Sequence, residues 1–125
     1  MTFGESISVC LKKYFVFEGR ASRSEYWWFQ LIVSPSYFIS EVLDNEISFF
    51  FLGITLFTLI PAISAGVRRL HDTNKSGFFL LISFIPFIGG LVLLFLLIIA
   101  GTKGKNRFGP DPLKKVQRKR KKNLN

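Results

Sequence analysis

The chain has 125 residues, of which 49% are hydrophobic and 15 are phenylalanine, and its formal net charge is +9. This is one domain at most, and its apolar surface is too large for so short a soluble chain to bury. The charge is concentrated: residues 101–125 hold ten Lys or Arg and one acid, whereas residues 1–100 are neutral. The single cysteine, Cys10, excludes an intrachain disulfide and a cysteine-based metal cluster.

Residues 2–17 place apolar side chains such as Phe3, Ile7 and Leu11 at helical spacing. This predicts a short amphipathic helix, within a segment 1–18, that either lies in the membrane interface or packs on the membrane domain. The residues around Lys12 and Lys13 lack the apolar core and cleavage site of a signal peptide, so we expect the first hydrophobic segment to stay as an anchor.

The next element begins with Ser22 and Glu25, which form the Ser-x-x-Glu pattern of a capping box ahead of an apolar run. We expect a helix over about 24–43 with a kink at Pro35, then an acidic turn at 44–46. A second helix follows over about 47–70, interrupted near Pro61. The aromatic residues at the start of the first helix favour the headgroup level of a bilayer; they are Tyr26, Trp27 and Trp28.

The third apolar segment, 77–100, belongs to a charge-free stretch over 76–102. It shows no polar face and exceeds the ~20 apolar residues that a membrane crossing needs. Pro86 and Gly89-Gly90 predict a break at its centre. Because basic residues mark the cytoplasmic side, a straight crossing would export the tail, so we favour a re-entrant hairpin. The basic tail, 103–125, has too little apolar content to fold and is predicted to be disordered.

These segments together predict an all-α fold: a polytopic α-helical membrane protein with an interfacial N-terminal helix, a transmembrane domain over 19–102 and a broken third hydrophobic segment. Two full crossings are expected, with both termini in the cytoplasm.

Three strings of the sequence resemble the DUF805 family of small bacterial inner-membrane proteins. They are FEGRASRSEYWWF at 17–29, LIPAISAGVRRLHDTNKSGF at 59–78, and IPFIG at 85–89 continuing to GTKGKNRFGPDP at 101–112. Phe78 and Phe79 stand where the family usually has tryptophan, and the basic tail is longer than the family pattern. The resemblance implies a multi-pass protein of the bacterial inner membrane with no established molecular function.

Two clusters of cations are the candidate functional residues, and both are predicted on the cytoplasmic side. In one interpretation their guanidinium groups bind anionic headgroups or a partner protein, since arginine binds phosphate and carboxylate through paired hydrogen bonds. In the other they are topology signals. Glu25 and Asp72 are predicted to form structural ion pairs with arginines across the loops. The candidate binding residues are Arg20, Arg23, Arg68, Arg69, His71 and Lys75.

The sequence offers little for catalysis. One histidine without a second soft ligand predicts no metal site, and no Gly-x-Ser-x-Gly or phosphate-binding loop is present. We therefore expect a non-enzymatic membrane component without cofactors. Its expected partners are anionic membrane lipids, and a homo-oligomer or a membrane-protein partner is the alternative; nucleic acid needs only the charge of the tail and is not favoured. The second hypothesis for function is a small oligomeric transporter or channel built around the broken segment 77–100.

Overall fold

The computed structural model describes residues 2–124, with the side chains of residues 115, 116 and 119 left out of the description. The all-helical fold is confirmed over this range. The elements are α1 (Phe3–Lys12), α2 (Arg23–Val42), α3 (Glu46–Asp72), the 3₁₀ helix η1 (Gly77–Phe84), α4 (Gly89–Ile98) and α5 (Pro112–Leu124).

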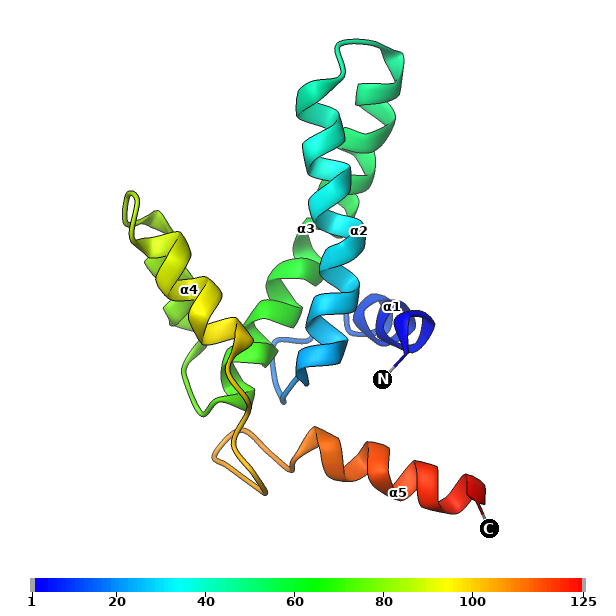
Figure 1. Ribbon diagram of the computed structural model, residues 1–125, viewed down its shortest axis with the longest axis vertical. Coiled ribbons are helices and arrows are strands. Elements are labelled where there is room, and N and C mark those ends of the chain that lie inside the picture. The colour runs from blue at the N-terminus through cyan, green and yellow to red at the C-terminus, as the bar shows by residue number, and fades with distance from the viewer. Residues whose placement is uncertain (1, 125) are drawn as a thin grey trace.

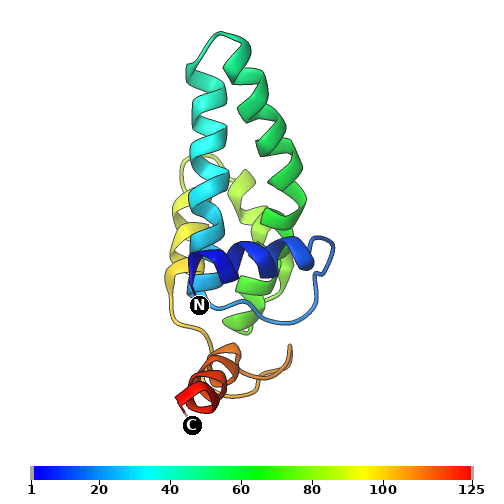
Figure 2. The same cartoon turned by 90° about the vertical axis from the view of Figure 1, so that its right-hand side faces the viewer.

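Two hairpins of unequal height rise from a common base (Figure 1). The tall hairpin consists of the antiparallel helices α2 and α3, and the short one of η1 and α4. Helix α1 crosses the base of the tall hairpin, and α5 lies below it (Figure 2). We call the end with α1, α5 and residues 68–75 the base, and the turn at 44–46 the tip.

Helix α1 is shorter than the predicted segment. It begins after Thr2, whose side chain accepts a hydrogen bond from the amide of Glu5 at 3.2 Å, and ends at Lys12, where the chain turns toward α2. Ser6 and Cys10 are buried, whereas Phe3 and Leu11 remain exposed. The helix therefore packs on the protein with one face and keeps apolar side chains on its surface.

The predicted cap of α2 is confirmed: the Ser22 hydroxyl accepts from the amide of Glu25 at 3.4 Å. Pro35 and Pro61 lie inside α2 and α3, and both helices continue through them. A proline cannot donate to the carbonyl four residues earlier, which for Pro61 is that of Phe57. The Tyr14 hydroxyl donates to this carbonyl at 2.5 Å, so the loop after α1 satisfies the bond that Pro61 leaves open.

The third apolar segment is divided at residues 85–88. Phe87 takes a positive φ of 66° in the turn, and a Cβ on Gly89 would lie 1.9 Å from the carbonyl oxygen of Ile82. The turn therefore requires glycine at this position for steric reasons. Both outer ends of this segment, at Gly77 and Ile98, lie toward the base (Figure 1).

The tail corrects the expectation of disorder, because residues Pro112–Leu124 form helix α5. Asp111 starts the helix by accepting from the amide of Leu113 at 3.0 Å. Lys, Arg, Gln and Leu are good helix formers, and this propensity acts even where apolar content is low. Composition alone undervalued both the cap and the propensity.

The buried apolar cluster is small and sits near the base. In the described residues it contains Cys10, Tyr26, Phe29, Ala65, Leu70, Leu96 and Leu97. Large apolar side chains toward the tip stay exposed, with Phe49 at 75% and Phe38 at 67%. Such a distribution suits an environment of lipid rather than water.

Candidate functional site

Five charged residues are buried together at the base, where the ends of α2, α3 and α4 meet. Three come from the last two turns of α3, one from the first turn of α2, and one from the loop before it. Arg68 and Arg69 are both 0% exposed. We call this group the arginine cluster; it consists of Arg20, Glu25, Arg68, Arg69 and Asp72.

Arg68 faces α1 and α2. Its Nη1 donates to Oε1 of Glu25, and the backbone carbonyl of Glu25 accepts from the Ser6 hydroxyl and from the Cys10 thiol. Among the described residues, Nε and Nη2 of Arg68 have no hydrogen-bond partner. Burial, and then the negative charge of Glu25, raise the pKa of the Cys10 thiol. The thiol is therefore protonated at neutral pH and acts as a hydrogen-bond donor rather than a nucleophile.

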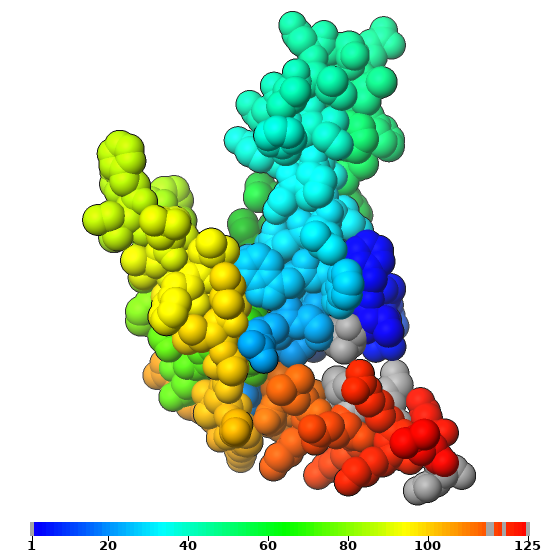
Figure 3. Space-filling view, viewed as in Figure 1, coloured from blue at the N-terminus to red at the C-terminus, as the bar shows by residue number. Residues whose placement is uncertain are grey.

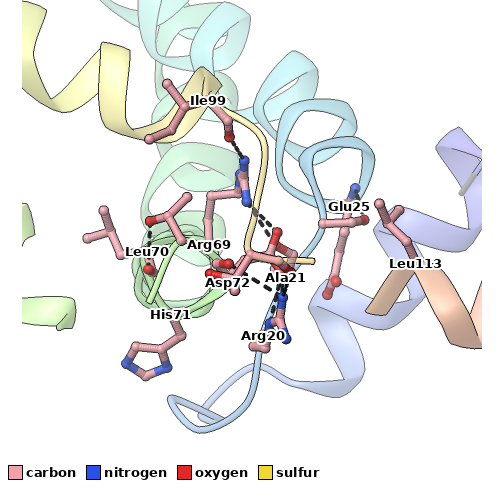
Figure 4. Close-up of polar contacts among 12 residues, drawn as sticks. Arg20, Ala21, Glu25, Arg69, Leu70, His71, Asp72, Ile99 and Leu113 are labelled. Atoms are coloured by element: carbon pink, nitrogen blue, oxygen red, sulfur yellow. Dashed lines mark hydrogen bonds and ion pairs between the residues drawn. The ribbon is translucent and has the colours of Figure 1, made fainter. Parts of the chain in front are cut away.

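Arg69 faces the short hairpin and holds its end. Its Nε donates to the carbonyl of Leu97 at 3.0 Å, its Nη2 donates to the carbonyl of Ile99, and its Nη1 pairs with Oδ2 of Asp72 at 2.7 Å. The indole of Trp27 donates to the same Leu97 carbonyl at 3.3 Å. The last carbonyls of a helix lack partners within the helix. At the end of α4 the guanidinium of Arg69 is the donor to them, as Figure 4 shows for the carbonyl of Ile99.

Arg20 joins the loop before α2 to the loop after α4. Its Nε donates to Oδ1 of Asp72 at 2.9 Å, and its terminal nitrogens donate to the carbonyls of Thr102 at 2.5 Å and Gly104 at 2.6 Å. Asp72 is thereby shared between two arginines (Figure 4). A Cβ on Gly101 would lie 1.9 Å from Oδ2 of Asp72, so the loop needs glycine to pass the carboxylate.

His71, near the end of α3, contacts both the loop before α2 and the loop after α4. Its Nδ1 lies 2.9 Å from the carbonyl of Gly19, and its backbone carbonyl accepts from the Asn106 side chain at 2.9 Å. The ring stacks on Phe108 with centroids 3.9 Å apart and an interplanar angle of 3°. His71 thus serves as a hydrogen-bonding group and a stacking platform. The three strings that carry the family resemblance are in direct contact here.

Three of the six candidate binding residues belong to the arginine cluster and are therefore poorly accessible to a ligand. The guanidinium groups of Arg20, Arg68 and Arg69 are buried against carboxylates and carbonyls of this chain, and removing one partner of such a pair would leave an uncompensated buried charge. Their burial favours a structural role for these three arginines, and headgroup binding by them stays a prediction. Of the candidates, Arg23 is exposed, whereas His71 and Lys75 are half-buried.

Several residues of the site were missed from the sequence. The partners of Arg20 and Arg69 are mostly backbone carbonyls, at 97, 99, 102 and 104, and a carbonyl carries no residue-type signal. Ser6, Cys10, Asn106 and Phe108 also belong to the site. The strings FEGRASRSE and GTKGKNRFGPDP carry the family resemblance, but the sequence does not indicate that they contact each other.

The described residues contain no group of three or more His, Cys, Asp or Glu side chains placed to hold a metal ion. Of the described helices, α3 alone is both long and apolar enough to cross a membrane by itself.

The fold and the site define a small α-helical membrane protein whose helix ends are joined by buried arginines. The chain belongs to the family described as "Protein of unknown function (DUF805)", whose sequence model matches residues 14–110. It is similar to inner membrane protein YhaI of Escherichia coli K12, with 44% identity over 106 residues, covering 82% of this chain and 90% of that protein. It is also similar to inner membrane protein YhaH of the same organism, with 40% identity over 112 residues, 82% of this chain and 91% of that protein. No solved structure matches the chain. The protein is located in the bacterial inner membrane.

Proposed function

We propose that this protein is a non-enzymatic component of the inner membrane that binds anionic lipid headgroups of the cytoplasmic leaflet through a cationic surface at its base. The observation that supports the proposal is the separation of charge along the molecule. Residues 24–67 and 76–102 contain no Lys or Arg, so the cations of the described residues lie at the base. The tip instead carries the acids Glu41, Asp44 and Glu46.

The lengths of the helices support a particular membrane arrangement. Helix α3, with 27 residues, spans ~40 Å and exceeds the ~30 Å hydrocarbon core. Helix α2 runs beside it over 20 residues and crosses with it in this proposal. The serines in its second half bond within the helix, as when Ser36 donates to the carbonyl of Ile32 at 2.7 Å.

The short hairpin is too short to cross the hydrocarbon core of a bilayer. The eight residues of η1 span ~16 Å and the ten of α4 span ~15 Å, about half of the hydrocarbon core. In the proposed arrangement this hairpin enters from the cytoplasmic side and returns to it. Both termini then face the cytoplasm, as the positive-inside rule expects.

The cationic surface consists of side chains that the arginine cluster does not use. Helix α5 contributes most of it, with exposed bases along its length and with the exposed apolar side chains Leu113 and Leu124 at its two ends. A cationic amphipathic helix is typical of binding at a lipid surface. Outside α5, the surface cations include Lys12, Arg23, Lys75, Lys103 and Lys105.

The test is retention of lipid by the full chain after extraction from membranes containing both phosphatidylglycerol and phosphatidylethanolamine, measured by native mass spectrometry. We expect phosphatidylglycerol to be enriched and to be released as salt rises. A variant with five α5 bases replaced by glutamine should lose at least tenfold in enrichment, since each base near an anionic surface contributes ~1 kcal/mol. The five are Lys114, Arg118, Arg120, Lys121 and Lys122.

The matched control removes charges at the opposite end. The variant Asp44→Asn with Glu46→Gln should keep the phosphatidylglycerol enrichment, because the tip lies in the other leaflet in this arrangement. Equal retention of the two lipids by the unmodified chain, or enrichment that survives the five-base change, would contradict the proposal.

A small oligomeric transporter is the second candidate, because a half-length hairpin beside full-length helices resembles the discontinuous helices of transport proteins. Flux of ions or small solutes into liposomes containing the protein, compared with empty liposomes, separates the two. Flux that disappears in a hairpin variant would favour transport.

A further inference from the structure

The two hairpins diverge from the base and leave a cleft between them (Figure 3). The cleft has a volume of about 700 Å³, within the ~300–1,000 Å³ that is usual for small-molecule sites. One wall comes from α2 and α3, including Ile63 and Gly66, and the other from η1 and α4, including Leu80 and Leu93. The cleft is therefore formed by segments far apart in the sequence.

The depth of the cleft matches one leaflet of a bilayer. Its lining on α3 runs from His71 at the base to Ala62, nine residues or ~14 Å along a helix. Half of a ~30 Å hydrocarbon core is ~15 Å. The short hairpin that forms the opposite wall has the same reach. A molecule filling the cleft thus extends over the depth of an acyl chain of the leaflet on the base side.

The polarity of the cleft changes along this depth. Toward the tip, the lining is mostly apolar, with Ile63 and Phe84, and the Ser83 hydroxyl there donates to the Leu80 carbonyl of its own helix at 2.8 Å. His71 and Ser76 line the cleft at the base, and Gln30 lines it from α2. No Asp or Glu side chain belongs to the lining. The ligand that fits is amphipathic, with an apolar chain toward the tip and a polar group at the base.

The rim at the base carries positive charge. Lys75 lies in the turn after α3, next to Ser76, and its Nζ donates to the Thr73 carbonyl at 3.4 Å. Arg107 lies over the ring of Phe108 at 4.7 Å, and that ring stacks on His71. Arg107 also donates to the Asn74 carbonyl at 3.3 Å. Neither cation lines the cleft itself, but each lies close to a residue that does, so the rim offers positive charge near the place where a phospholipid headgroup would lie.

We propose that the cleft holds one phospholipid of the cytoplasmic leaflet, with an acyl chain between the hairpins and the phosphate at the rim formed by Lys75 and Arg107. The inner-membrane location supplies this ligand at the open side of the cleft. The site goes beyond the cationic surface of α5, because the apolar cleft binds the chain whether the rest of the headgroup is anionic or neutral.

The experiment uses the full chain in nanodiscs with a phosphatidylethanolamine that carries a photoactivatable diazirine halfway along one acyl chain. Labelled peptides are identified by mass spectrometry as the amount of probe is raised. We expect labelling of the cleft at 62–67 and 80–93 to saturate at one probe per chain. Labelling of the exposed side chains near Phe49 should instead rise in proportion to the probe, as for bulk lipid.

Matched variants separate the cleft from the outer face. Ile63 lines the cleft and is 44% exposed, whereas Leu59, one turn away, is 47% exposed and does not line it. Ile63→Trp should lower the saturable labelling at least tenfold, and Leu59→Trp should leave it unchanged. Leu93→Trp fills the cleft from the other wall and gives an independent variant if one of them folds poorly, as judged by its melting temperature.

The outcomes are distinct. Cleft labelling that never saturates, that survives both filling variants, or that is absent because another chain occupies the cleft overturns the proposal. Lys75→Gln should weaken the saturable component several-fold without abolishing it. Because the probe is a neutral lipid, failure here leaves the binding of phosphatidylglycerol to the α5 surface untouched, and failure of that binding leaves the cleft site untouched.

Discussion

Two neighbouring arginines serve two different interfaces because consecutive residues on a helix point about 100° apart. Arg68 is directed to α1 and α2 and pairs with Glu25, whereas Arg69 is directed to α4 and pairs with Asp72. One helix end therefore joins both hairpins and α1. A lysine would not replace Arg69, because the ammonium lacks the planar set of donors that reaches several carbonyls at once.

Breaking the pair between Arg68 and Glu25 should be strongly destabilising. Glu25→Gln leaves a buried guanidinium without its carboxylate, and we expect a loss of about 3–5 kcal/mol in the free energy of unfolding. Arg68→Met combined with Glu25→Gln should lose less than the sum of the two single changes. Denaturant unfolding in detergent measures all three, with Arg23→Met, an exposed position, expected to stay within about 0.5 kcal/mol of the parent. Strict additivity would contradict the pairing.

Asp111 should titrate below its ordinary pKa. Partial burial by itself raises the pKa of Asp111, but the amides of Gly104 and Leu113 and the charge of Arg20 lower it by more, so the net pKa is below 3.8. A lowered native pKa means that the contribution of Asp111 to stability is present above the ordinary value and is lost as the pH falls through the native pKa.

The measurement for Asp111 is an NMR titration of the Gly104 and Leu113 amides in the full chain. We expect both amide shifts to change together with a midpoint below 3.8, and Asp111→Asn to abolish the step. A midpoint at or above the ordinary value would show that the two amides do not hold the carboxylate.

At the scale of elements, the helices depend on groups outside themselves. Pro61 leaves the carbonyl of Phe57 without its helical donor, and Tyr14 from the loop after α1 supplies one. The end of α4 depends on Arg69 in the same way. A backbone group at membrane depth must find a partner within the protein, so each repair also fixes the position of a neighbouring element.

The repair of α3 can be tested with a double-mutant cycle. Tyr14→Phe should cost about 1–3 kcal/mol, because it leaves the Phe57 carbonyl without its hydroxyl donor. In a Pro61→Ala background the helix supplies its own amide to that carbonyl, so the same tyrosine change should cost clearly less. Thermal unfolding in detergent gives both values. An equal cost in the two backgrounds would assign the effect of Tyr14 to packing alone.

The turn of the short hairpin offers a neighbouring pair of glycines as a test. A Cβ at Gly89 would lie 1.9 Å from the Ile82 carbonyl oxygen, whereas nothing lies within 4 Å of a Cβ at Gly90. Gly89→Ala should open the turn between η1 and α4 and raise amide hydrogen exchange over 80–95. Gly90→Ala should be neutral or slightly stabilising, since alanine is the better helix former. Equal exchange in both variants would mean that the turn is not closely packed.

At the scale of the whole molecule, charge and length together set the arrangement in the membrane. The cations lie at the base, the tip is acidic, and the short hairpin has about half the reach of the tall one. In the proposed arrangement these features give the base and the tip different environments, and the cationic surface and the rim of the cleft then lie at the same leaflet.

Reporter fusions test this arrangement directly. A phosphatase inserted in the turn at 44–46 should be active in the periplasm, and the same enzyme fused after Asn125 should be inactive, while a fluorescent protein fused there should fold and emit. An active phosphatase after Asn125 would mean that residues 77–98 cross the membrane once, and the re-entrant hairpin would be wrong.

The features of this structure that depend on neighbouring residues in the chain could be predicted from the sequence. The cap at Ser22, the break around Pro86 and Gly89, and the long apolar helix before the RRLHD string each depend on residues adjacent in the chain. The pairing of Arg68 with Glu25 was among the pairs expected, because buried charge needs a partner and few acids are near the base. Low apolar content predicts disorder for the tail, whereas helix propensity and the cap at Asp111 favour helix α5.

The sequence by itself determined that this is a helical membrane protein with a basic end, because hydropathy and charge act locally along the chain. Only the tertiary structure decided which cations are free. Arg20, Arg68 and Arg69 look no different from Arg23 in the sequence, yet they are buried against carbonyls and carboxylates contributed by distant segments. The cleft was likewise beyond the sequence, since its two walls come from hairpins whose divergence is set by contacts at the base.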